Sequence, residues 1–152
     1  MSTPSKTLQQ VEDTLSTIID NLIDSQDGFQ KIGDELKDED LRLYFLAESL
    51  TRAQFRGELE TILHQEGVHE IKEGGTTSGT IHRAWADLKT TLGGGDHTLL
   101  VTAEQAEDEA KEAYKEALDT QLPFPVRQVL SSQSAQIQAS HDYVKAARDS
   151  SK

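Results

Sequence analysis

The residues best suited to metal chemistry in this chain are its five histidines and the acidic residues around them. A di-iron centre inside a helical bundle takes a glutamate from each of two helices and a Glu-x-x-His pair from each of the other two, because that spacing places carboxylate and imidazole on one inner face. Four histidines lack a glutamate three residues earlier: His64, His82, His97 and His141. Only His69 follows one, Glu66, and Gly67 lies between them at an expected helix end. The standard di-iron ligand set is therefore absent from the sequence.

Polar residues nevertheless fall on the apolar faces of the expected helices. The set that we expect to form a buried polar layer is Glu48, Arg52, Glu107 and Gln133. A buried charge without a partner costs several kcal/mol, so it must be paired or neutralised. Arg52 can pair with Glu48, one helical turn away in the favourable acidic-before-basic order, and also with Glu107. The sequence therefore predicts a salt-bridge and hydrogen-bond layer that fixes helix register, in which a guanidinium does what a metal would otherwise do.

A metal-binding alternative stays open at the same level of the bundle. Its non-standard carboxylate and histidine ligands for iron or another divalent cation would be Glu48, Glu104, Glu107 and His141. We favour the interpretation without a cofactor, because Arg52 already supplies a permanent cation there.

The segment from His64 to Glu70 also has two interpretations. Two histidines and two acids around a helix end could bind zinc, nickel or copper at the surface. Two histidines five residues apart lie on different sides of a helix, however, so a solvated helix end is the favoured interpretation.

Composition excludes several classes of protein. Of the 152 residues, 27 are acidic and 15 basic, which gives a formal net charge of −12. That balance argues against nucleic acid or an anionic membrane as a partner, since both require a basic face. The absence of cysteine excludes disulfides and thiolate metal sites. With no apolar run of about 18 residues and no apolar core of a secretory signal, we expect a cytoplasmic protein with a single domain over residues 1–152.

The elements that must position these residues are helices. Apolar residues recur at steps of three and four, as in Leu8, Val11, Leu15 and Ile18, which marks a helix face rather than an alternating strand. The pattern predicts long helices over residues 7–36, 38–66, 96–120 and 125–148 and a short one over 80–92. It continues through Gly28, which we interpret as an interior glycine tolerated at a cost of about 1 kcal/mol.

Local signals set the helix ends. Asp38 and Asp96 are suited to N-terminal caps, and Pro125 to a first helical position. Gly67 ends the second long helix. The connection between the second and third long helices runs to about 30 residues, far more than a tight bundle loop needs. It is long enough to travel the length of the bundle, so we expect an all-α, ferritin-like four-helix bundle with up-down-down-up topology and a crossover helix.

Five sequence segments carry a resemblance to a known family. They are Asp27-Gly28, Leu-Ala-Glu-Ser-Leu-Thr-Arg-Ala-Gln-Phe at 46–55, Ile-His-Arg-Ala-Trp-Ala-Asp-Leu-Lys at 81–89, Glu104-x-x-Glu107-Asp108 and Tyr114-x-x-Ala117-Leu118. Over roughly residues 7–148 the chain resembles an uncharacterised bacterial family of ferritin-like four-helix-bundle proteins of unknown function. The resemblance implies a fold and a superfamily but no activity.

Two functional classes follow. The favoured one is a non-enzymatic bundle with a structural, interaction or stress-associated role, and the alternative is a metal-binding protein or oxidoreductase with the non-standard ligands. Leu43, Tyr44 and Leu46 exceed what one bundle face needs, so we also expect a homodimer or docking of the helix that carries Trp85.

Overall fold

The computed structural model describes residues 4–67, 85 and 88–151, and in these residues every regular element is a helix. The elements are α1 (Pro4–Glu35), α2 (Glu39–Gln65), α4 (Leu88–Thr91), α5 (Asp96–Leu118) and α6 (Phe124–Ser150). The predicted all-α class with four long helices is confirmed, and the bounds of these helices differ from the expected ones by at most three residues. Most of the short helix expected over 80–92 lies outside the described residues.

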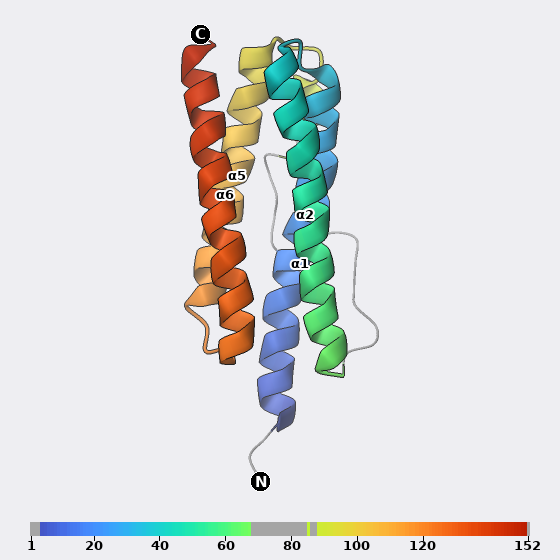
Figure 1. Ribbon diagram of the computed structural model, residues 1–152, viewed down its shortest axis with the longest axis vertical. Coiled ribbons are helices and arrows are strands. Elements are labelled where there is room, and N and C mark those ends of the chain that lie inside the picture. The colour runs from blue at the N-terminus through green and yellow to red at the C-terminus, as the bar shows by residue number, and fades with distance from the viewer. Residues whose placement is uncertain (1–3, 68–84, 86–87, 152) are drawn as a thin grey trace.

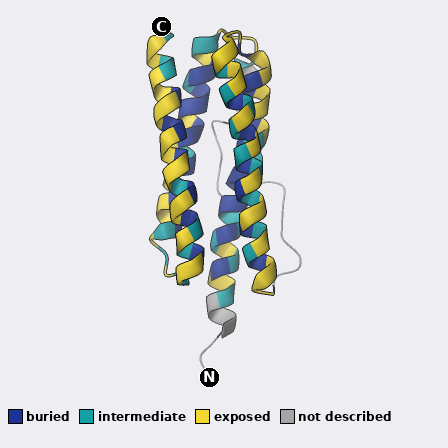
Figure 2. Cartoon of the chain, in the orientation of Figure 1, coloured by how far each residue is buried: buried dark blue, intermediate teal, exposed yellow. Residues whose placement is uncertain are grey.

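The four long helices pack as two antiparallel pairs, α1 with α2 and α5 with α6 (Figure 1). In the orientation of Figure 1, α1 and α6 run upward and α2 and α5 run downward. The pairs join because α1 also packs against α5, and α6 makes a smaller contact with α2. Figure 2 shows the buried residues on the inward faces and the exposed ones outside, as the apolar periodicity requires.

Two apolar clusters make up the core, and each long helix passes from one to the other. Along α2, Phe55 belongs to the cluster that contains Val11 and Leu15, whereas Phe45 belongs to the cluster that contains Trp85. A buried polar residue lies between the two clusters on every long helix: Ser25, Arg52, Glu107 and Ser140. The polar level thus crosses the whole bundle at one height.

Hydrogen bonds at the helix ends include one that the sequence did not suggest. Asp38 caps α2 as predicted, since its carboxylate accepts a hydrogen bond from the Leu41 backbone N–H at 3.0 Å. Asp96 does not cap α5, because it is the first residue of that helix and Gly95 holds the cap position. Its carboxylate instead accepts from the backbone N–H groups of Lys37 and Asp38, at 2.9 and 3.0 Å. Asp96 therefore ties the start of α5 to the turn between α1 and α2.

Gly28 is a packing requirement as well as a tolerated interior glycine. Its missing side chain makes room for the indole ring of Trp85, with which an added Cβ would overlap. The same ring packs edge-on against Phe29, with centroids 5.6 Å apart. The close approach of the indole therefore places Trp85 itself against α1.

In the part of the chain that the structure describes, no helix combines the length and apolar character needed to cross a membrane.

Candidate functional site

The central polar level of the bundle holds a fully buried arginine. Arg52, from the middle of α2, has no exposed side-chain area, and its Nη2 donates to both carboxylate oxygens of Glu107 on α5, at 2.9 and 3.0 Å. The Glu107 side chain is only 1% exposed. The pair therefore meets inside the protein, where an unpaired charge of either sign would be strongly unfavourable.

Glu48 is the second carboxylate on the same guanidinium. Its Oε1 lies 3.3 Å from Arg52 Nη2 and 3.4 Å from Nε, one helical turn away on α2, and its side chain keeps 14% of its exposed area. Burial raises the pKa of Glu48, with Arg52 acting in the opposite direction. Burial alone would lower the pKa of Arg52, but the carboxylates of Glu107 and Glu48 outweigh it and raise that pKa above its usual value. The guanidinium is therefore a permanent cation in the core.

We call Glu48, Arg52 and Glu107 the Glu–Arg–Glu layer, and two further side chains contact it. The hydroxyl of Ser140 on α6 donates to Glu107 and also lies 3.3 Å from Arg52 Nη2. The ring of Phe29 on α1 lies under the guanidinium, with its centroid 4.6 Å from Cζ, a cation–π distance. All four long helices thus contribute to one cluster around Arg52. Arg52 Nη1 has no hydrogen-bond partner among the described residues.

Gln133 lies in a separate polar cluster rather than against Arg52. Its Oε1 accepts from the hydroxyl of Tyr114 at 2.7 Å, and its Nε2 donates to the Phe55 carbonyl at 3.2 Å and to Glu58 at 2.9 Å. Burial raises the pKa of Tyr114 strongly, so its hydroxyl remains a donor. This second cluster joins α2, α5 and α6 within the Val11-containing half of the core.

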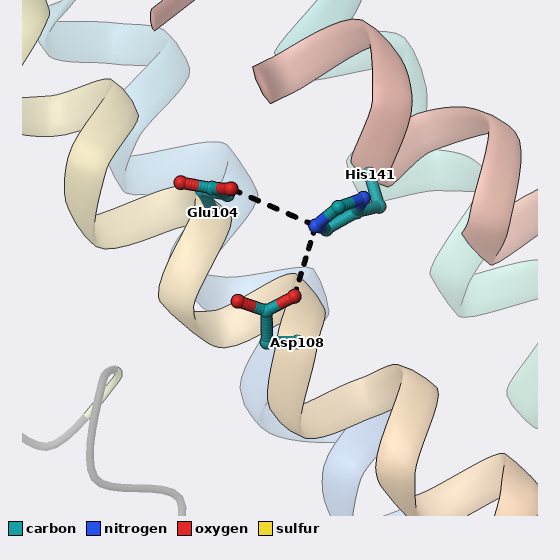
Figure 3. Close-up of side chains that lie close together, drawn as sticks. All are labelled: Glu104, Asp108 and His141. Carbon is teal, nitrogen blue, oxygen red and sulfur yellow. Dashed lines mark ion pairs between the residues drawn. The ribbon is translucent and has the colours of Figure 1, made fainter.

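A third cluster lies between α5 and α6 and is the only group of three potential metal ligands in the described residues: Glu104, Asp108 and His141. In Figure 3 the two carboxylates project from successive turns of α5 toward the imidazole from α6. His141 Nε2 lies 2.9 Å from Asp108 Oδ1 and 3.7 Å from Glu104 Oε2. The imidazole and Glu104 are largely buried, whereas Asp108 is 59% exposed.

Outer partners orient two of these three side chains. His141 Nδ1 lies 3.2 Å from Asp142 Oδ1, which also accepts from Gln138 Nε2 at 3.0 Å. These two hydrogen bonds lower the pKa of Asp142, the one from His141 contributing most. On the other side, Arg148 donates to Glu104 Oε1 and leaves Oε2 directed at the imidazole.

The four candidate ligands of the metal-binding alternative therefore lie in two separate clusters. Glu48 and Glu107 contact Arg52, whereas Glu104 and His141 face each other in the third cluster, between α5 and α6. This third cluster also contains Asp108, which sequence analysis missed because a glutamate-only search at three-residue spacing does not examine an aspartate.

Ser140 was missed because a serine carries no charge that marks it as a partner for Arg52. The candidate surface site over residues 64–70 stays a prediction. His64 is exposed near the end of α2, and His69 lies outside the described residues.

Comparison with known proteins gives a family but no activity. A family model described as "Domain of unknown function (DUF2383)" matches residues 10–120. The match includes α2 and α5, which supply Arg52 and its two carboxylates, and it ends before α6. Comparison with curated proteins gave no significant match. Because the family model covers well over half of the sequence, this chain belongs to the family of proteins that share the domain of unknown function DUF2383.

Proposed function

We propose that this chain is a non-enzymatic, ferritin-like helical bundle of the bacterial cytoplasm with a structural, interaction or stress-associated role. In this proposal the Glu–Arg–Glu layer takes the place of a di-iron site. The observation that carries it is the position of Arg52, whose Nη2 contacts Glu107 at 2.9 Å and Glu48 at 3.3 Å at the level where the four helices meet.

Charge is the reason why this layer disfavours metal. A di-iron centre needs bridging carboxylates whose oxygens are free to bind cations. Both oxygens of Glu107 accept from Arg52 here, and Glu48 faces the same guanidinium. A divalent cation at these oxygens would have to displace the permanently charged guanidinium of Arg52, whose side chain is fully buried.

The helix directions support the ferritin-like part of the proposal. Two antiparallel pairs, with α2 and α5 running the same way in Figure 1, require a connection that returns along the bundle. The number of residues between the end of α2 at Gln65 and the start of α5 at Asp96 is sufficient for such a return, and a bundle with one long crossover is the ferritin-like arrangement.

Self-association through the outer face of α2 belongs to the same proposal. Leu46 is used inside the chain, where it packs on Gly33, and Tyr44 stacks on Tyr143 with ring centroids 3.8 Å apart. Leu43 and Leu50 remain 57% and 71% exposed. We expect these two leucines to be covered in a homodimer, so Leu43→Ser should shift the sedimentation equilibrium toward the monomer.

Metal dependence of folding tests the central claim. The protein, freed of metal with a chelator, should stay folded in the absence of urea and should oxidise Fe²⁺ no faster than buffer. Unfolding on chelation, or rapid Fe²⁺ oxidation, would instead favour the oxidoreductase alternative.

A further inference from the structure

We propose that Glu104, Asp108 and His141 bind one first-row transition-metal dication, of which Zn²⁺ is the test case, between α5 and α6. This site lies outside the Glu–Arg–Glu layer and goes beyond the proposed function, because it assigns a ligand to residues that the layer does not use.

The spacing of the donor atoms fits such an ion. Ligand atoms about 2.0–2.1 Å from a tetrahedral Zn²⁺ are separated from one another by about 3.3 Å. His141 Nε2 lies 2.9 Å from Asp108 Oδ1 and 3.7 Å from Glu104 Oε2, so the two distances bracket that value. All three donor atoms lie within 4.8 Å of one another. Small side-chain adjustments would therefore bring all three onto one ion.

The imidazole is already held in the orientation that metal ligation requires. Metal-binding histidines usually donate their other ring N–H to a carboxylate, which fixes the tautomer and leaves the ligating nitrogen with its lone pair. His141 has that partner, since Nδ1 lies 3.2 Å from Asp142 Oδ1, and Gln138 Nε2 holds the same oxygen at 3.0 Å. Nε2, directed at Glu104 and Asp108, is therefore the nitrogen left for a cation.

Charge and access also favour a small hydrated cation. Three carboxylates, those of Glu104, Asp108 and Asp142, surround the imidazole. Arg148, on the other oxygen of Glu104, and Lys111, near Asp142, neutralise only part of this charge. The 59% exposure of Asp108 gives an entry path from solvent. Three protein ligands leave a coordination position for water, and the mixed imidazole and carboxylate donors suit zinc better than Mg²⁺ or Ca²⁺, which prefer oxygen alone.

Calorimetric titration with Zn²⁺ tests this site, with Mg²⁺ as the comparison ion. The wild-type protein should bind a single Zn²⁺ per chain and should not bind Mg²⁺ with comparable affinity. Asp108→Asn and His141→Gln should each weaken Zn²⁺ binding by at least the roughly tenfold that loss of an outer-shell partner costs. Asp108 is exposed, so Asp108→Asn leaves the core intact.

Two matched controls separate ligation from general electrostatics. Glu112→Gln removes one charge from the exposed side of α5 a helical turn beyond Asp108, and His64→Gln removes an exposed imidazole from α2. Both should retain wild-type Zn²⁺ affinity. Equal losses in Asp108→Asn and Glu112→Gln, or loss of binding in His64→Gln, would overturn the assignment.

Nitrogen NMR of the imidazole distinguishes a bound cation from a bound proton. Zn²⁺ should move the Nε2 resonance of His141 and leave Nδ1 protonated, and an unchanged His141 spectrum at saturating Zn²⁺ would refute the site. A chelator effect on folding that persists in Asp108→Asn would count against the metal-free layer rather than against this site.

Discussion

Truncation of Arg52 is the most direct perturbation of the buried layer. Arg52→Ala removes the cation that neutralises Glu107, whose side chain is 1% exposed and cannot recover hydration without local unfolding. Removing one partner of a buried pair typically costs about 3–5 kcal/mol, because it leaves an uncompensated charge. We therefore expect Arg52→Ala to lower the free energy of unfolding by about that amount.

The chain itself offers a matched control one turn away on α2. Arg56 pairs with Glu60 at 3.0 Å at the same i,i+4 spacing but in the reverse order, and both side chains are 27% exposed. Exposed pairs contribute about 0–1 kcal/mol, so Arg56→Ala should cost correspondingly little. The two truncations remove the same side chain from the same helix, so their difference measures the combined effect of burial and of the contact between Arg52 and Glu107.

A double variant tests whether uncompensated charge causes the loss. Arg52→Met keeps most of the side-chain volume but leaves the Glu107 carboxylate without its cation. Adding Glu107→Gln to this variant removes the carboxylate charge as well, so neither charge remains. Because Glu107 contacts Arg52 more closely than Glu48 does, it is the more informative partner. We expect the double variant to be more stable than Arg52→Met alone, since neutral replacements of a buried pair are often tolerated.

Urea unfolding followed by circular dichroism, with and without chelator, measures all these variants. Arg52→Lys serves as the milder change if Arg52→Ala does not fold, because an ammonium keeps the charge but loses the planar fork. The reasoning fails if Arg52→Ala costs no more than Arg56→Ala, or if Glu107→Gln gives no recovery in the Arg52→Met background.

Three further predictions concern neighbouring features of the bundle. Gly28→Ala should destabilise by about 1–3 kcal/mol and shift the emission of the single tryptophan, because the new methyl group overlaps the indole. The control Gly57→Ala, where an added Cβ meets nothing within 4 Å, should instead stabilise α2 by about 0.5–1 kcal/mol. Tyr114→Phe should cost about 1–3 kcal/mol in urea unfolding, because it leaves the buried Gln133 oxygen without its donor. Burial raises the pKa of Glu48, so the folded protein holds that proton more tightly than the unfolded chain does. As the pH rises from the ordinary pKa of glutamate through the raised pKa of Glu48, the free energy of unfolding of the wild type should therefore fall relative to that of Glu48→Gln. An equal pH dependence of the free energy of unfolding in the two proteins would contradict this.

The fold was accessible from the sequence because helix faces are a local, periodic signal. Apolar steps of three and four located all four long helices, and Asp38 marked the start of α2. Asp96 shows the limit of such reasoning. Its residue type and position match a cap, yet its carboxylate binds N–H groups of Lys37 and Asp38, which only the packing of α5 beside the α1–α2 turn brings near.

Two contacts of the site were accessible from the sequence, one within α2 and one, between Arg52 and Glu107, because both residues fall on apolar helix faces. Glu48 and Arg52 are one turn apart, so their proximity follows from helix geometry alone. Contacts between helices depend on rotation and register, which periodicity fixes only to within about a residue. Because of that uncertainty the sequence predicted Gln133 in the same layer as Arg52, whereas in the structure Gln133 contacts Tyr114. It also hid Asp108, whose partner His141 comes from another helix.

Adjacent residues on α5 and α6 face two clusters with opposite electrostatic requirements. Successive residues on a helix point about 100° apart, so Glu107 turns inward to Arg52 while Asp108 turns to His141 at the edge of the bundle. On α6, Ser140 donates to Glu107 and His141 faces Asp108 in the same way. The buried pair carries its own cation, whereas the carboxylates of Asp108 and Asp142 at the edge are exposed to solvent. A single register of α5 against α6 therefore serves both clusters, and the contacts that neutralise the interior also determine which residues meet at the edge.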